Sequence, residues 1–373
     1  MSETTMGKLG FGLMRLPHKI MRIDIEQTSR MVDAFLKAGF SYFDTAHVYP
    51  GSEEAMAKAL VQRHPRESYT VASKLYAPLA TSKRAAHRQF DTTLQHTGLE
   101  YLDYYLLHSL TKGNYRKYDR FDLWSFVQQK KDQGLVRHVG FSFHSGPELL
   151  DQILTEHQEV DFVQLQLNYA DWENPKVTSR ANYEVARAHG VPIVVMEPVK
   201  GGKLATPPRE AADLMRAANP TASYASWAIR FAAGLEGVMC VLSGMSDTKQ
   251  MQDNISFMRD FKPLDETERK VIQQVQVIMG NSTLVACTNC RYCVDGCPAN
   301  IPIPEVLDAL NVHLGGYADN AQAAYRRAVI GKGRASDCIQ CGECEATCTQ
   351  GIDVIERLQQ ASAVFDETSI ART

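Results

Sequence analysis

Eight of the nine cysteines in this 373-residue chain fall into two quartets that share one spacing. The first comprises Cys287, Cys290, Cys293 and Cys297, and the second comprises Cys338, Cys341, Cys344 and Cys348. Three cysteines held two residues apart suit one 4Fe–4S cluster, and the fourth usually ligates the other cluster. The spacing therefore predicts two 4Fe–4S clusters with crossed ligands, in which Cys348 completes the first triplet and Cys297 completes the second.

Zinc and disulfides explain this spacing less well. Structural zinc sites usually pair two CxxC knuckles across a longer loop. Disulfides require an oxidising compartment, and the sequence shows no sign of export. Thr349 replaces the proline that follows the first quartet as Pro298, but this difference removes no ligand.

Polar residues also end three consecutive apolar runs earlier in the chain. Asp44, Lys74 and His108 are the last residues of these runs, and Tyr49 lies in the segment after the first of them. A tyrosine hydroxyl, whose ordinary pKa is near 10, is a poor acid alone. An ammonium group nearby favours the phenolate, and a carboxylate keeps that ammonium in place. With His108 beside the substrate oxygen, the group could protonate a carbonyl as hydride reaches its carbon.

The elements that would position these residues alternate between strand and helix. Apolar runs predict strands at Leu9–Leu13, Ser41–Asp44, Tyr69–Lys74, Tyr104–His108, His138–Ser142, Phe162–Gln166, Ile193–Met196 and Val238–Ser243. Helical spacing of apolar residues predicts helices at Ile25–Ala38, Ser82–Thr97, Phe121–Gln133, Gly146–Glu156, Pro175–His189 and Ser223–Ala233. Eight such steps predict an α/β fold, a (β/α)8 TIM barrel. The alternative is a doubly wound sheet, which the absence of a Gly-x-Gly-x-x-Gly motif disfavours.

The barrel is expected over residues 1–262, a connecting helix over 263–281 and the cysteine domain over 282–373. The 40 residues between Cys297 and Cys338 contain helical patterns at Pro304–Val312 and Asn320–Val329. This insertion is longer than a compact ferredoxin needs. We therefore expect a small, mainly helical two-cluster domain that is similar to the ferredoxin-like modules of respiratory iron–sulfur subunits.

Composition limits the kinds of partner. The net charge of −3 argues against a nucleic-acid partner. The longest apolar stretch, Tyr224–Leu242, is interrupted by Arg230 and Glu236, so no membrane span is expected. Met1–Lys8 lacks the basic start and apolar run of a signal peptide, and we expect a cytoplasmic protein.

Several segments resemble the aldo-keto reductase family over about residues 8–260. They are FDTAHVYPGSE with Asp44 and Tyr49, ASK with Lys74, DYYLLH with His108, VGFS with Ser142, FVQLQLNY with Gln164, and SGMSDTKQMQDN. The resemblance implies NAD(P)H-dependent carbonyl reduction, with Tyr49 as the general acid, Asp44 and Lys74 tuning it, and His108 orienting the carbonyl. It also implies that Ser142 and Gln164 hold the nicotinamide carboxamide. With the two quartets, the whole chain resembles a bacterial and archaeal branch of iron–sulfur aldo-keto reductases.

The chain departs from the family pattern in its cofactor contacts. Met196 replaces the aromatic residue that usually stacks on the nicotinamide. Gly244 and Gln250 stand where the family usually offers a Lys and an Arg to the 2′-phosphate of NADP, so the preference for NADP should weaken. Asn254 is expected to contact adenine. Lys200 and Lys203 could face a pyrophosphate or be ordinary loop lysines.

Two classes of function follow from these residues. The first is an oxidoreductase that acts on a small carbonyl substrate. The second is an electron-transfer subunit without catalysis that uses the barrel as a scaffold. Nicotinamide carries two electrons and each cluster carries one, which leaves three arrangements. The clusters could be structural beside an ordinary reductase, a flavin in the barrel could split electron pairs, or a redox partner protein could feed electrons through the clusters. Substrate-selecting loops are expected at Leu110–Arg120 and Val199–Asn219. Tyr115, Tyr118, Arg120 and Trp124 could form an aromatic-lined mouth, but roles facing solvent are expected for them.

Overall fold

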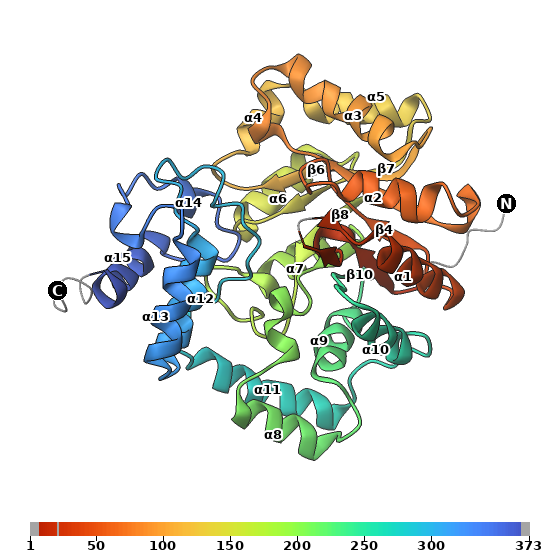
Figure 1. Ribbon diagram of the computed structural model, residues 1–373. Helices are drawn as coiled ribbons and strands as arrows, with labels where there is room; N and C mark the ends of the chain where they lie inside the picture. Colours follow the sequence, from red (N-terminus) through yellow and green to blue (C-terminus); the bar gives the residue numbers. More distant parts are fainter. Residues whose placement is uncertain (1–6, 21, 367–373) are drawn as a thin grey trace. The chain divides into compact units, whose positions relative to one another are not determined.

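The computed structural model describes residues 7–20 and 22–366 (Figure 1). Most of Met1–Lys8, where the sequence lacks a leader pattern, lies outside the described residues. The chain divides into two compact units. The first comprises residues 1–199 and 204–276, and the second comprises residues 200–203 and 277–373.

The first unit is a closed barrel of eight parallel strands, as predicted. Around the barrel the order is β1 (Leu9–Gly12), β10 (Val238–Ser243), β9 (Ile193–Met196), β8 (Phe162–Gln166), β7 (Val136–Phe143), β6 (Leu102–Leu110), β5 (Thr70–Leu75) and β4 (Tyr42–Asp44). A separate two-stranded antiparallel sheet joins β2 (His18–Lys19) to β3 (Arg22–Ile23). The predicted strands agree with the observed ones to within two residues at every boundary because each is an apolar run between polar segments.

The barrel interior is filled with side chains that point inward from alternate strand positions. Tyr42, Leu106, Phe162 and Cys240 belong to one buried cluster there. Cys240, the cysteine outside the two quartets, is completely buried and acts as a small core residue. The barrel is therefore a packed core, and any chemistry must lie at its ends.

Helices lie outside the strands (Figure 1). They are α1 (Ile25–Lys37), α2 (Ser52–Met56), α3 (Lys83–Thr97), α4 (Tyr115–Arg120), α5 (Leu123–Asp132), α6 (Pro147–Glu156), α7 (Ser179–Ala188), α8 (Arg209–Ala218), α9 (Tyr224–Ala233), α10 (Thr248–Met258) and α11 (Glu266–Gly280). Helix α1 shows why they form. The Asp24 carboxylate accepts a hydrogen bond from the Gln27 backbone N–H and caps the helix, and Phe35 packs against Phe11 and Phe43.

Two expectations about the loops were wrong. Tyr118 and Trp124 do not face solvent, because they lie on the buried sides of α4 and α5 at 0% and 7% exposure. The segment Val199–Asn219, expected as a loop, contains α8, whose apolar side is made mainly of alanines and Met215. Alanine gives a weak hydrophobic signal, which explains why this helix was missed. No helix among the described residues is both long and apolar enough to cross a membrane.

The second unit is mainly helical, as predicted. It contains α12 (Ile303–Leu314), α13 (Ala318–Ala328), α14 (Glu343–Ala346) and α15 (Val354–Phe365). Its core joins Val306, Leu310 and Leu358, and the rings of Tyr325 and Phe365 stack with centroids 4.6 Å apart. Cysteine residues complete this core, so the cysteine loops are tied to the helices that flank them.

Candidate active site and metal centre

Asp44, Lys74 and His108 come from three neighbouring strands of the barrel. β4 pairs with β5 and β5 pairs with β6, with Lys74 opposite Leu106. Asp44 ends its strand, and Lys74 and His108 lie within two residues of the ends of theirs. These three residues therefore lie at the same end of the barrel, as the sequence predicts.

Lys74 and Asp44 form a buried ion pair. Lys74 Nζ lies 2.6 Å from Asp44 Oδ1 and donates a second hydrogen bond of 2.7 Å to the Thr45 carbonyl. Burial lowers the pKa of the Lys74 ammonium, and the charge of Asp44 limits this fall. Burial also raises the pKa of the Asp44 carboxyl, against the pull of Lys74. The pair stays together because separating either charge from its partner would leave it without solvent or counter-charge.

Tyr49 and His108 complete the group at the mouth of the barrel. The Tyr49 and His108 rings meet edge to face with centroids 5.6 Å apart, and Lys74 Nζ lies 5.0 Å from the Tyr49 ring centroid. Burial lowers the pKa of His108 well below its ordinary value, and the Lys74 charge lowers it further. His108 is therefore neutral at neutral pH and can offer an N–H to a substrate oxygen without carrying charge.

A second tyrosine, Tyr76, lies at the same site and was not predicted. Its ring lies 5.6 Å from that of His108. The Gln89 side chain fixes this position, because it accepts a hydrogen bond from the Tyr76 N–H and donates one to the Tyr76 carbonyl. Buried Tyr118 also donates its hydroxyl hydrogen bond to the His108 carbonyl and so supports the end of β6. Neither contact has a local sequence signal.

Ser142 and Gln164, the expected carboxamide contacts, are direct partners across β7 and β8. The Ser142 hydroxyl oxygen accepts a 2.7 Å hydrogen bond from the Ser109 backbone N–H. Gln164 Nε2 lies 3.5 Å from Met196 Sδ, and Gln164 Oε1 is buried without a hydrogen-bond partner among the described residues. An unpaired buried amide oxygen is costly unless a ligand supplies a donor. A carboxamide NH₂ group is such a donor, so these residues fit a nicotinamide.

The expected contacts to the adenosine end lie at β10 and α10. Gln250 takes part in the cap of α10, where its Oε1 accepts a 2.8 Å hydrogen bond from the Ser246 N–H. Asn254 is buried and donates a 2.6 Å hydrogen bond to Ser243 Oγ. Both residues thus make hydrogen bonds that hold the segment at and just after the end of β10.

Cationic side chains from other segments lie near Gly244 and Gln250. A side chain at Gly244 would meet Arg15, whose Cδ lies 3.3 Å from the position of an added Cβ. A surface cavity of about 450 Å³ brings Arg216 of α8 and Lys249 of α10 together with Gln250. Sequence comparison at equivalent positions cannot find these cations because they come from other segments.

Lys200 and Lys203 belong to the second unit. Lys203 Nζ donates a 3.0 Å hydrogen bond to the Val285 carbonyl, and Lys200 Nζ donates one of 3.2 Å to Gln350 Oε1. These contacts give both lysines a structural role beside the cysteine loops.

The eight cysteines gather into two groups whose membership is crossed. One small cavity is lined by Cys297 together with Cys338, Cys341 and Cys344, and by isoleucine and leucine side chains. In the other group, Cys287, Cys290 and Cys348 lie close enough to Cys293 to raise its pKa. Each triplet therefore receives its fourth thiol from the opposite quartet, as the spacing predicts.

The backbone of the two cysteine loops repeats. Asn289 and Arg291 have left-handed φ angles of 55° and 68°, and Gln340 and Gly342, at the equivalent positions, have 58° and 82°. These turns let three thiols face one point. Burial raises the pKa of Cys287 and of Cys344 to about 11, so these thiols stay protonated at neutral pH unless a metal replaces the proton. The donor set and the backbone fit 4Fe–4S clusters.

Comparison with known proteins agrees with both halves of the chain. Residues 8–277 match the model of the aldo/keto reductase family, and residues 286–353 match a 4Fe-4S dicluster domain. An aldo-keto reductase of Mycolicibacterium smegmatis is 30% identical over 149 residues, which cover 40% of this chain and 50% of that protein. Protein REDOX 2 of Catharanthus roseus is 31% identical over 170 residues, 41% of this chain and 51% of that protein. The matched segments thus span about half the length of these curated relatives.

Solved structures share the barrel. An aldo/keto reductase of Klebsiella pneumoniae, in complex with NADP and acetate, superposes with a TM-score of 0.59 at 20% identity over 73% of this chain and 92% of that one. The holo form of AKR11C1 from Bacillus halodurans gives a TM-score of 0.57 at 24% identity over 72% and 91%. At this identity the likeness concerns the fold. With a family match over most of its length and the strand-end residues in place, this chain belongs to the aldo/keto reductase family.

Proposed function

We propose that this chain is an NAD(P)H-dependent oxidoreductase that reduces a carbonyl group. The observation that carries the proposal is the buried Lys74–Asp44 ion pair, which lies against the ring of Tyr49 and beside neutral His108. Family membership and the NADP bound to the Klebsiella relative support it.

Each residue has a distinct part in the proposal. Bound NAD(P)H would supply hydride to the substrate carbonyl carbon. Tyr49 donates the proton to the carbonyl oxygen, and the Lys74 ammonium stabilises the phenolate that remains. Asp44 holds Lys74 in position, and His108 donates a hydrogen bond to the same oxygen. Ser142 and Gln164 orient the nicotinamide through its carboxamide.

The second unit would hold two 4Fe–4S clusters on the crossed cysteine groups. The Sγ atoms supply all eight ligands, and Asn289 N–H and Ile352 N–H lie 3.4 Å from the Cys287 and Cys348 sulfurs. Such N–H···S contacts stabilise reduced clusters. Electron exchange between one-electron clusters and a two-electron nicotinamide would need a flavin or a redox partner protein.

The test of carbonyl reduction is Tyr49→Phe. Oxidation of NADPH and of NADH would be followed with a panel of aldehydes and ketones under anaerobic conditions. General acid catalysis is worth about 10²- to 10⁴-fold, so kcat/KM should fall by that factor. Tyr183→Phe, which removes a hydroxyl that donates to the Glu236 carbonyl on the surface, should leave the rate unchanged.

Two results would contradict the proposal. Full turnover in Tyr49→Phe would exclude Tyr49 as the proton donor. A wild-type protein that reduces no carbonyl compound but passes electrons to and from its clusters would instead indicate an electron-transfer subunit. Flavin and iron content of the anaerobic protein would show which redox groups are present.

A further inference from the structure

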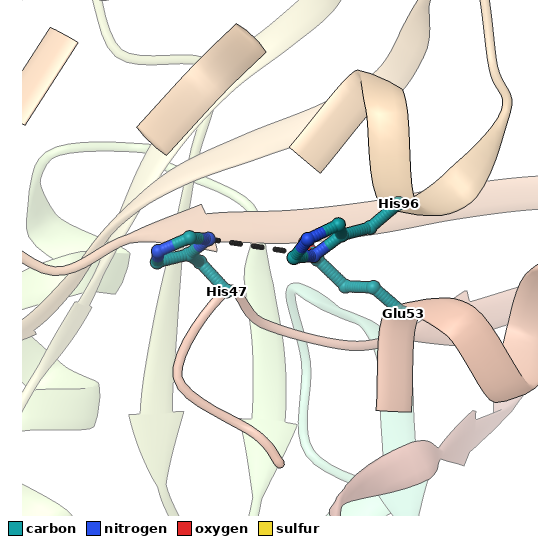
Figure 2. A group of neighbouring side chains, drawn as sticks. All are labelled: His47, Glu53 and His96. Atoms are coloured by element: carbon teal, nitrogen blue, oxygen red, sulfur yellow. Dashed lines mark hydrogen bonds and ion pairs between the residues drawn. The ribbon is translucent and has the colours of Figure 1, made fainter. Parts of the chain in front are cut away.

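Three side chains other than those of Asp44, Tyr49, Lys74 and His108 converge beside the loop that carries Tyr49. They are His47 from the loop after β4, Glu53 from α2 and His96 from the last turn of α3 (Figure 2). One ligand-type atom of each residue lies within 4.8 Å of those of the other two. Segments about 50 residues apart thus bring two imidazoles and one carboxylate to a single point.

The carboxylate of Glu53 is buried and held in place. Its side chain is only 2% exposed, and Oε1 accepts a 2.8 Å hydrogen bond from Ser73 Oγ. This bond directs Oε2 toward the imidazoles, and His96 Nδ1 lies 3.2 Å from it. A buried carboxylate is costly unless charged or hydrogen-bonding partners lie close by.

His47 leaves this arrangement incomplete. Its Nδ1 lies 4.0 Å from Glu53 Oε2, which is beyond hydrogen-bond distance. The same nitrogen is buried and has no hydrogen-bond partner among the described residues. The His47 and His96 rings are nearly parallel, at 11° with centroids 6.3 Å apart. A buried ring nitrogen therefore faces a buried carboxylate oxygen with a gap between them.

We propose that His47, Glu53 and His96 bind a divalent transition-metal ion. Zinc bonds to histidine nitrogen and carboxylate oxygen are about 2.0–2.2 Å long, so tetrahedral ligand atoms lie about 3.3 Å apart. The Glu53–His96 separation already has this value, and a small rotation of His47 closes the remainder. Two imidazoles with one carboxylate suit Zn²⁺ and Fe²⁺, whereas Ca²⁺ and Mg²⁺ prefer oxygen ligands alone.

A fourth ligand is within reach. Glu54 Oε1 lies 3.5 Å from His96 Nδ1, and its side chain is 47% exposed. Either this carboxylate or water would complete four-coordination. All four of these residues belong to the first unit.

The position of the site suggests what the ion does. His47 lies between Asp44 and Tyr49 in sequence, and Ser73, which holds Glu53, precedes Lys74. A bound ion would link α3 to the loop that carries Tyr49 and restrain that loop. The ion would brace the structure and would not touch the substrate.

Metal content of the full-length, cluster-loaded protein tests the proposal. Wild type, His96→Ala and His189→Ala would be dialysed anaerobically against micromolar Zn²⁺, and bound zinc would be measured by mass spectrometry. His189 pairs with Asp151 on the surface and serves as the control. Wild type and His189→Ala should each hold one zinc more per chain than His96→Ala. Equal zinc in all three would overturn the proposal.

Two further measurements keep the test decisive. His96→Asn retains a polar side chain of smaller size, so a zinc deficit in this variant excludes gross misfolding as the cause, provided its circular dichroism is unchanged. Zinc should raise the unfolding temperature of wild type and not of either His96 variant, and a shift common to all would contradict the proposal. Parallel dialysis against Fe²⁺ identifies which of the two ions binds at the lower free concentration.

Discussion

Lys74 Nζ lies 2.6 Å from Asp44 Oδ1, and the two side chains are 0% and 5% exposed. Such a pair contributes little net stability against an apolar alternative, but removal of one partner is costly because the other charge stays buried. Its presence next to Tyr49 and His108 is therefore explained better by chemistry than by stability.

This relationship predicts an asymmetry between single and double variants. Lys74→Met leaves Asp44 without its counter-charge and should lower the free energy of unfolding by about 3–5 kcal/mol. The double variant Asp44→Asn with Lys74→Met should recover much of this loss, as measured by chemical denaturation, yet remain inactive. Recovery of activity along with stability would show that the pair is only structural.

The cavity beside α10 predicts a cofactor preference. If Arg216 contacts the 2′-phosphate of NADP, Arg216→Ala should raise KM for NADPH about 10-fold, since a hydrogen bond to a charged group contributes about 1.5–3 kcal/mol. KM for NADH should change little. Arg209→Ala, on the same helix with a 96% exposed side chain, is the matched control. Equal effects on both cofactors would exclude Arg216 as a 2′-phosphate contact.

The crossed cysteine groups predict which double variants keep a cluster. Cys297 and Cys338 line the same cavity, so Cys297→Ala with Cys338→Ala should remove one cluster and about half of the iron. Cys297→Ala with Cys290→Ala should remove ligands from both clusters and nearly all of the iron. Iron and sulfide analysis after anaerobic purification measures how much cluster each double variant retains. The reverse pattern would mean that each quartet holds its own cluster.

Buried His108 predicts a pH dependence of stability. Burial keeps the pKa of His108 well below its ordinary value, while the unfolded chain regains a pKa near 6.5. Below about pH 6.5 the unfolded state therefore binds the proton first, and the stability of the barrel should fall as the pH falls toward the folded pKa. His108→Asn should reduce the slope of unfolding free energy against pH in this window. An unchanged slope would show that other groups carry the acid sensitivity.

Sequence alone was sufficient for the strands, for the grouping of the cysteines and for the placement of Asp44, Tyr49, Lys74 and His108 near one another. Each of these depends on a short-range pattern: an apolar run that ends in a polar residue, or thiols two residues apart. Residues Asp44, Lys74 and His108 could be placed together because consecutive parallel strands of a barrel end on the same side.

Tertiary structure decided the rest. Gln89 on α3 holds Tyr76 at the site. Arg216 and Lys249 line one cavity with Gln250, and Glu53 meets His47 and His96 from separate segments. These arrangements depend on how helices pack against the barrel, and packing brings together residues whose separation along the chain carries no periodic signal. The sequence thus determined which groups are available for chemistry at each strand end and cysteine loop. Only the folded chain determined which buried polar atoms, such as Gln164 Oε1 and His47 Nδ1, are left for a ligand to satisfy.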